Sequence, residues 1–423
     1  MRQRTPAAPA PASAPAGRSR ALGRNVLALS LVSLLTDASS EIIYPLLPLF
    51  LSTVLGASAA AVGLVEGAAE STAALLKLAS GWWSDRVRRR KPLVVAGYAL
   101  AAVARPLLAL ATATSQVLAI RMTDRVGKGI RTAPRDALIA DSVAPEIRGR
   151  AFGFHRAADH AGAVIGPLLA FGMLSGLGLP LREVFLWAAL PGALAVLALV
   201  VLVREPEREV HAAHVAHAAA PGIAGPPDLR APLPASFRRY LVVLLLFTLG
   251  NSSDAFLLLR ASQLGVAAPL IPLLWAALHV VKAASSVPGG SLSDRLGRKP
   301  LIVAGWLLYA AVYVLFGRAT ETWHAWALFL VYGLYFGLTE GVEKALVADL
   351  VPAARRGAAF GWYNLAIGLG ALPASVLFGM VWDRYGAGPA FGVGAVLAVA
   401  AAGGLLMLVP SSMHPGAAAR PGA

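Results

Sequence analysis

The chain carries about twelve apolar runs, each long enough to cross a bilayer, and these runs constrain its fold most strongly. Crossing roughly 30 Å of hydrocarbon takes about 20 apolar residues in a helix. A helix also satisfies its backbone hydrogen bonds within the segment, as a span in lipid must. The connections are short, so no large soluble domain fits into the 423 residues. We therefore expect an all-α integral membrane protein. The expected spans are 26–50, 60–82, 92–112, 115–141, 151–175, 184–203, 240–262, 267–290, 300–317, 323–349, 358–380 and 388–409.

The runs fall into two groups of six, separated by a polar stretch. The expected organisation is a disordered Pro/Ala-rich tail (1–23), a six-helix bundle (24–203), a linker (204–239), a second six-helix bundle (240–410) and a second tail (411–423). Three linker histidines, His211, His214 and His217, suggest a metal-binding tract as an alternative. A solvated linker is the better interpretation, and we predict no metal site.

Two stretches of the first half recur in the second half. "GWWSDRVRRRKPLVVAGY" (81–98) resembles "GSLSDRLGRKPLIVAGW" (290–306) at an offset of 209. "DALIADSVAPEIRGRAFGFH" (136–155) resembles "KALVADLVPAARRGAAFGWY" (344–363) at an offset of 208. Two parallel repeats with a site between them are typical of a transporter.

The net charge of +15 follows the loops and does not mark one soluble face. Lys and Arg number 23 on one side of the spans and 4 in the opposite loops. This positive-inside pattern predicts that both termini and the linker lie in the cytoplasm. We expect the chain to lie in a bacterial inner membrane. The pattern also argues against nucleic-acid binding. The first apolar run could mimic a signal peptide, but no small-residue cleavage site follows it.

The loop motifs resemble those of the major facilitator superfamily, over residues 24–410. The second copy of the diagnostic loop motif is complete, with Gly290, Asp294, Arg295, Gly297, Arg298 and Lys299. The first copy has Gly81, Asp85, Arg86, Arg89 and Arg90. Arg88 stands there in place of the inner glycine, which puts a tight turn in doubt because glycine adopts positive φ most easily. The resemblance implies two pseudo-symmetric six-helix bundles and a cytoplasmic gate at these loops. A positive-inside loop without a gating role is the alternative.

The fifth span contains "GAVIGPLLAFG", with Gly162, Gly166, Pro167 and Gly172. It partly resembles the Gly-Pro motif of antiporters in the family, and so favours efflux. Plain helix packing through small residues is the alternative.

The fourth span holds the densest charge in the chain, "RMTDRVGKGIRTAPRD" (121–136), with seven charged residues in sixteen. At about 100° per residue these side chains fall on one stripe of a helix, which predicts a cavity wall. They could instead pair with one another or reach the interface. Five cations against two acids leave a surplus, which needs acids from elsewhere or an anionic solute.

Ionisable residues inside spans mark the helices that face water or a partner. For the substrate pathway we predict Arg121, Asp124, Arg125, Lys128, Asn251, Tyr332, Phe336, Thr339 and Glu343. For proton coupling, which requires a carboxylate that exchanges its proton near neutral pH, we predict Asp37, Glu41, Asp159, Asp254 and Glu343. Arg125 and Asp37 are expected to be needed for transport but not for folding.

The predicted function is a secondary active transporter of a small polar or anionic solute, proton-coupled and leaning to efflux. A proton-coupled exporter of lipophilic cations is the alternative. The sequence has no Walker motif and no Cys, so we expect neither ATP drive nor thiol chemistry, and no cofactor. A membrane enzyme built around His155, Asp159 and His160 is disfavoured, because it would not explain the repeats. We expect the solute, protons and lipid as partners, and a functional monomer.

Overall fold

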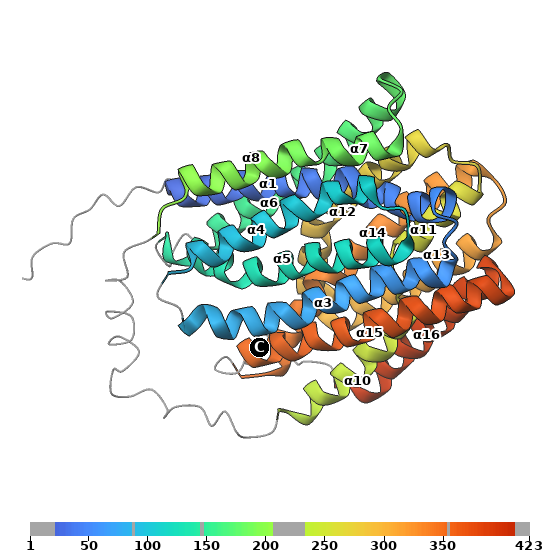
Figure 1. Ribbon diagram of the computed structural model, residues 1–423. Coiled ribbons are helices and arrows are strands. Elements are labelled where there is room, and N and C mark those ends of the chain that lie inside the picture. The colour runs from blue at the N-terminus through green and yellow to red at the C-terminus, as the bar shows by residue number, and fades with distance from the viewer. Residues whose placement is uncertain (1–21, 87–88, 144–147, 206–232, 353–355, 411–423) are drawn as a thin grey trace, which may run out of the picture.

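The computed structural model describes residues 22–86, 89–143, 148–205, 233–352 and 356–410, and this part of the chain is helical with no strand (Figure 1). The expectations for the two tails and for most of the linker fall outside the described residues. The first half consists of α1 (Arg24–Ile43), α2 (Leu47–Leu49), α3 (Ala59–Arg86), α4 (Lys91–Ala104), α5 (Thr114–Asp141), α6 (Arg148–Phe171), α7 (Leu181–Trp187) and α8 (Ala189–Leu202). The second half consists of α10 (Ala235–Gly250), α11 (Ala255–Gln263), α12 (Ile271–Leu296), α13 (Arg298–Arg318), α14 (Thr322–Leu350), α15 (Arg356–Tyr385) and α16 (Ala387–Leu408).

Eleven of the expected spans appear as helical segments that are long and apolar enough to cross a membrane. The remaining expected span is α5, a helix of 28 residues whose charged stripe lowers its hydropathy. Counted with α5, the helices make up the predicted all-α membrane fold of twelve spans. Several spans are interrupted: α1 passes through a tight turn at Tyr44–Leu46 into α2, and α10 and α11 flank a non-helical stretch at residues 251–254. Pro45 and Pro48 explain the first interruption, because proline cannot donate the helical hydrogen bond.

The two halves repeat the same packing scheme. In the first half α1 packs against α6 and α8, and α5 packs against α3 and α4. In the second half α10 packs against α15 and α16, and α14 packs against α12 and α13. The halves meet mainly where α3 lies against α15 and where α6 lies against α12. These two helix pairs, α3 with α15 and α6 with α12, form most of the contact between the halves.

The two ends of the bundle are called the linker end and the far end. The linker end carries the start of α1, the end of α8 and the start of α10; there Asn25 bonds the backbone of Arg204. The far end is the opposite one, where α3 begins at Ala59 and α15 ends at Tyr385. The repeated loop motifs begin in the last turns of α3 and α12, and Figure 1 shows the end of α3 at the linker end.

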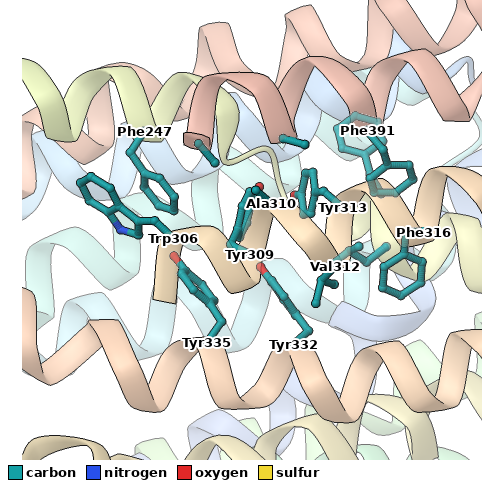
Figure 2. Close-up of a cluster of buried hydrophobic side chains, with 14 of the residues drawn as sticks. Phe247, Trp306, Tyr309, Ala310, Val312, Tyr313, Phe316, Tyr332, Tyr335 and Phe391 are labelled. Carbon is teal, nitrogen blue, oxygen red and sulfur yellow. The ribbon is translucent and has the colours of Figure 1, made fainter. Parts of the chain in front are cut away.

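A cluster of stacked aromatic rings fills the core of the second half (Figure 2). Phe247 of α10 stacks on Trp306 of α13 with ring centroids 4.4 Å apart, and Tyr309 stacks on Tyr313 at 4.1 Å. Buried phenol groups need hydrogen-bond partners. Tyr309 Oη donates to the carbonyl of Gly250 at 3.0 Å, at the point where α10 ends.

Two glycine positions have clear structural reasons. Gly162 of α6 lies so close to α1 that an added Cβ would sit 2.4 Å from the carbonyl oxygen of Leu34. This close approach accounts for the glycine in the fifth span by helix packing. Gly297, in the second loop motif, has a φ of +93°, which glycine adopts at little cost. Position 88, its counterpart in the first copy, lies outside the described residues.

Candidate functional site

A cavity of about 390 Å³ lies between the two halves. It is lined by side chains from α1, α3, α5, α12, α14 and α15 and from the non-helical stretch at 251–254. Tyr44 and Arg105, in the short 3-10 segments that follow α1 and α4, complete the lining. Nine of the residues singled out in the sequence face it: Asp37, Glu41, Arg121, Arg125, Lys128, Asn251, Asp254, Tyr332 and Phe336. These residues are spread over about 300 positions in the chain, and the fold brings them to one place.

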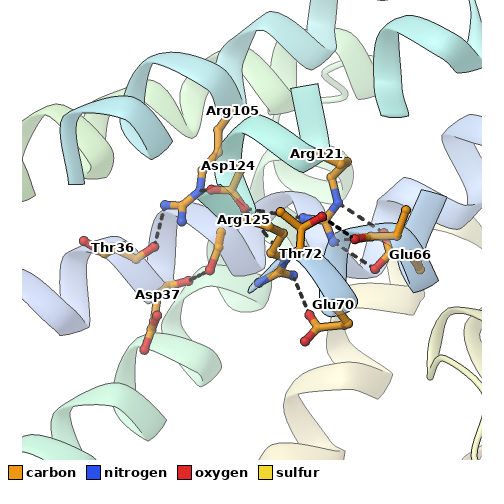
Figure 3. Close-up of polar contacts among 11 residues, drawn as sticks. Thr36, Asp37, Glu66, Glu70, Thr72, Arg105, Arg121, Asp124 and Arg125 are labelled. Atoms are coloured by element: carbon orange, nitrogen blue, oxygen red, sulfur yellow. Dashed lines mark hydrogen bonds and ion pairs between the residues drawn. The ribbon is translucent and has the colours of Figure 1, made fainter. Parts of the chain in front are cut away.

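Two arginines of the basic stripe on α5 are paired with acids of α3 (Figure 3). Arg121 makes a two-pronged contact with Glu66, with both Nη2–Oε distances at 2.9 Å. Arg125 Nη2 lies 3.3 Å from Oε1 of Glu70, one turn further along α3. The Arg121–Glu66 contact, in which Nε and Nη2 both donate to the carboxylate, is a strong charge-assisted pair. The surplus cations of α5 need acids from elsewhere in the chain, and α3 supplies two of them, Glu66 and Glu70.

Asp124 lies behind the cavity wall and pairs with a residue of another helix. Its Oδ1 accepts a hydrogen bond from Arg105 Nε at 2.9 Å, and Arg105 also donates to the carbonyl of Thr36. Arg121 lies farther from it, with an Nη1–Oδ2 distance of 3.8 Å. No role for Arg105 was predicted from the sequence, although it is the single charge in the third apolar run. An isolated charge in such a run requires a partner, and that was the signal available.

The charges around the cavity nearly balance. Six Arg and Lys side chains line it, and so do five Asp and Glu side chains. Asp124, directly behind Arg105, makes the two numbers equal. Burying a charge without compensation is strongly unfavourable, so balance is what the low-polarity surroundings require. The cavity is thus an array of opposite charges and not a uniformly positive site.

The wall contributed by the second half is built from rings and acids. Tyr332 Oη donates to Oδ1 of Asp254 at 2.7 Å, and this bond ties α14 to the stretch between α10 and α11. Phe336 carries the ammonium group of Lys282 over its ring, with Nζ 4.1 Å from the centroid. Lys282 also pairs with Glu340 at 3.2 Å.

One contact inside the cavity joins the two halves. Trp275 Nε1 of α12 donates to Oε2 of Glu41 on α1 at 2.7 Å, and its ring lies 5.1 Å from that of Tyr44. Glu41, Tyr44 and Trp275 all line the cavity. A change in the relative position of the halves would therefore alter this contact directly.

The remaining predicted residues lie away from the cavity lining. Glu343 is buried in the second half and accepts hydrogen bonds from Trp306 Nε1 and Tyr363 Oη, both at 2.9 Å. Thr339 is buried as well, and its hydroxyl donates to the carbonyl of Tyr335. Neither is among the cavity-lining residues.

Asp159 also lies outside the lining, on α6. Its carboxylate is 3.7 Å from Nε2 of His155, one turn away as the sequence predicted, and 3.7 Å from Nη1 of Arg156. His160 does not line the cavity either.

The far end is closed by contacts between α3 and α15. The two carboxylate oxygens of Asp383 accept hydrogen bonds from the backbone N–H groups of Ala59 and Ala60, each at 2.8 Å. An acid from the second half thus caps the first turn of a helix in the first half, where unpaired N–H groups favour negative charge. Gly63 brings the helices so close that an added Cβ would lie 2.1 Å from the carbonyl oxygen of Ser375.

At the linker end, the repeated loops make equivalent contacts within their own halves. Arg90 pairs with Asp141 at the end of α5. Arg298 pairs with Asp294 and lies 3.5 Å from Asp349, near the end of α14. Asp349 corresponds to Asp141 at the repeat offset, so the internal symmetry extends to these ion pairs.

The structure describes the backbone or the exposure of the other predicted gate residues, but not all of their side chains. Arg89, Arg295 and Gly290 lie near the ends of α3 and α12, and Arg89 and Arg295 are exposed. The side chains of Asp85 and Arg86, and the surroundings of Gly81, are outside the described part of the chain. The gate therefore remains a prediction.

Comparison with known proteins places the chain in a large transporter family. The family model described as "Major Facilitator Superfamily" matches residues 29–261 and 240–422. An uncharacterised MFS-type transporter of Methanocaldococcus jannaschii is 34% identical over 395 residues, which cover 92% of this chain and 95% of that protein. The multidrug resistance protein MdtH of Cronobacter sakazakii is 33% identical over only 148 residues, or 35% of this chain and 37% of that protein.

Among solved structures, a bacterial homologue of the human lysosomal transporter Spinster, in an inward-facing and unoccupied conformation, has a similar fold. The TM-score is 0.68, with 18% sequence identity, and the match covers 91% of this chain and 94% of that one. At this identity the likeness concerns the fold alone.

Proposed function

The chain belongs to the major facilitator superfamily, and from this premise we propose that it moves a small polar or anionic solute across the membrane by alternating access. That it is a multi-pass membrane transporter follows from the family and the helical fold. The solute class is our inference. The observation that carries it is a cavity between the halves lined by eleven Asp, Glu, Lys and Arg side chains. An apolar solute would leave such a lining desolvated without compensation.

Alternating access requires contacts between the halves that break once per cycle. The contacts of Asp383 with α3 close the far end, and they join groups from different halves. Two ion pairs at the linker end, Arg90 with Asp141 and Arg298 with Asp294, each join groups of the same half. We propose that this conformation faces the linker end, and that the loop motifs engage when the cavity turns to the far end. The positive-inside count supports the proposal that the linker end is the cytoplasmic one.

Proton coupling is the second part of the proposal. Among the described residues, three cavity carboxylates have no Arg or Lys nitrogen within 4.0 Å: Asp37, Glu41 and Asp254. Each could therefore gain or lose a proton without leaving a cation unpaired. Glu66, Glu70 and Asp124 are ion-paired and suit a fixed structural role. Glu343 and Asp159 are secondary candidates, because both lie outside the lining.

A transport assay in proteoliposomes tests these proposals together. Counterflow of a labelled solute, with small polar acids and neutral polar compounds as competitors, should show exchange that depends on the protein. An imposed pH gradient should then drive net accumulation if protons are coupled. Exchange without any response to the gradient would remove proton coupling and leave transport intact. One chain supplies both walls of the cavity, so we propose that the monomer is sufficient.

Export of lipophilic cations is the alternative that specific observations favour. The partial match to the multidrug resistance protein MdtH is one. The second is the face formed by Trp275, Tyr332 and Phe336 with the acids Glu41 and Asp254, since cations bind to aromatic faces and carboxylates. The same vesicles discriminate: competition by a quaternary ammonium dye, without competition by acids, would support this alternative. Efflux direction rests on this match and on the partial Gly-Pro motif.

A further inference from the structure

Two cations of the cavity differ from the others in having no acid partner. Lys128 and Arg131 lie one turn apart on α5, and both line the cavity. Among the described residues, no carboxylate oxygen lies within 4.0 Å of either side chain. The other four cavity cations do have such partners: Arg105 with Asp124, Arg121 with Glu66, Arg125 with Glu70, and Lys282 with Glu340. The charge balance of the cavity is therefore not uniform along α5.

Arg131 is held in place but incompletely satisfied. Its guanidinium carbon lies 4.3 Å from the centroid of the Tyr98 ring, which fixes one face of the group. The residue is only 4% exposed. Its Nη1 has no hydrogen-bond partner in the described part of the chain. Buried donors are nearly always paired, so a pre-positioned guanidinium with a free N–H group at a cavity wall points to a missing acceptor.

The electrostatic surroundings point the same way. Arg125 and Lys77 repel Lys128, while Glu70 and Asp37 attract it. Arg105 repels Arg131, while Asp124 and Asp37 attract it. All three attracting carboxylates stand beyond ion-pair distance from Lys128 and Arg131, and Glu70 and Asp124 are already paired with other arginines. Like charges gathered at low dielectric destabilise one another. An anion between Lys128 and Arg131 would relieve that repulsion and supply the acceptor that Arg131 lacks.

We propose that Lys128 and Arg131 form the subsite for the anionic group of the transported solute, a carboxylate or a phosphate. This inference rests on the proposed function and deepens it. The planar guanidinium offers a forked pair of donors, and the lysine offers a mobile point charge. Both suit an oxygen anion. The paired arginines Arg121 and Arg125 then serve to build the wall, and the solute binds nearer to the linker end.

The test is anion binding to the purified full-length protein in detergent, which needs neither a gradient nor a known solute. Unfolding is followed by tryptophan fluorescence while sodium acetate or sodium phosphate replaces sodium chloride at constant ionic strength. We expect one of these anions to raise the apparent Tm of the wild type. Lys128→Gln should weaken that binding by about tenfold or more, as expected for loss of a charge-assisted contact. Lys344→Gln is the matched control, because Lys344 is half-exposed, paired with Glu340 and outside the cavity lining.

The comparison of variants decides the outcome. Arg131→Gln should act like Lys128→Gln, whereas Lys128→Arg, which keeps the charge, should retain most of the binding. A preference for acetate identifies a carboxylate site, and a preference for phosphate identifies a phosphate site. Equal stabilisation of the wild type and Lys128→Gln, or no stabilisation of the wild type by either anion, overturns the subsite. Absence of counterflow in vesicles, with anion binding intact, would instead count against the proposed transport of such solutes.

Discussion

Helices α5 and α14 occupy equivalent places in the two halves, yet they form cavity walls of different chemistry. At the repeat offset of 208, Asp124 corresponds to Tyr332 and Lys128 to Phe336. Both helices pack against the equivalent neighbour, α5 against α3 and α14 against α12. The α5 wall is held by ion pairs with Glu66 and Glu70. The α14 wall is held by ring contacts, one phenol–carboxylate bond and a more exposed ion pair between Lys282 and Glu340. The backbone scheme thus tolerates opposite wall chemistries, provided that the neighbouring helix supplies the matching groups.

The largest effect is expected from breaking the ion-paired wall. Glu66→Gln leaves Arg121, whose side chain is 5% exposed, without its main partner. Removing one member of a buried pair costs about 3–5 kcal/mol, because the remaining charge stays desolvated. The apparent Tm and the yield of monodisperse protein in detergent should both fall.

The control for this change comes from the other wall. Glu340→Gln removes the acid partner of Lys282, but the Glu340 side chain is 39% exposed. An ion pair that is this exposed contributes about 1 kcal/mol or less. Equal losses in the two variants would contradict the distinction between a buried structural pair and a solvated one.

The second prediction concerns which wall couples protons. Asp37→Asn and Asp254→Asn each remove one carboxylate that has no cation within 4.0 Å among the described residues. We expect at least one variant to keep counterflow and to lose accumulation driven by a pH gradient, because exchange needs no proton movement. Arg125→Gln should reduce both activities, since Arg125 holds Glu70 in the wall. Gradient-driven accumulation at the wild-type level in both carboxylate variants would exclude these two sites.

A smaller effect is expected where the halves meet. Asp383→Asn removes the charge that caps α3 from α15, and an amide can accept at only one oxygen. Loss of a helix cap costs about 1 kcal/mol, enough to shift the population toward an open far end. The chain contains no Cys, so spin labels at Ser58→Cys and Tyr385→Cys can report the distance across this end.

The labelled variant should show longer distances than the labelled parent. Glu183→Gln, an exposed acid in the first turn of α7, is a matched control within the first half. It should leave the distance distribution unchanged. The same distribution in Asp383→Asn as in the parent would show that the glycine packing of α3 against α15 closes the far end by itself.

The smallest effect is expected from Tyr332→Phe in the aromatic wall. The change removes the hydrogen bond to Asp254 and keeps the ring contacts. Water entering the cavity would replace most of this hydrogen bond, so the net loss should be about 0.5 kcal/mol. We expect a severalfold weaker half-saturation for counterflow with little change in Tm. A loss of stability as large as that of Glu66→Gln would mean that the two walls are built alike.

Much of the architecture follows from the sequence, because apolar length and charge periodicity are local properties. The predicted spans agree with the observed helices within a few residues. This includes α5, although its charged residues make its mean hydropathy lower than that of the other spans. The stripe on α5 was predicted from helical geometry, and Arg121, Arg125 and Lys128 do line the cavity. The pairing was not predictable: Asp124 was predicted to lie in the substrate pathway, with pairing inside the span as the alternative, and its shortest contact is with Arg105.

What the sequence determined by itself is therefore the membrane class, the twofold repeat and the set of charges that must be accounted for inside the bilayer. The tertiary structure decided which of those charges neutralise each other. Glu66 and Glu70 are paired with α5, whereas Asp37, Lys128 and Arg131 are left without an ion-pair partner among the described residues. The reason is physical: the energy of a buried charge depends on groups within a few ångströms, and those groups come from helices that are distant in the chain.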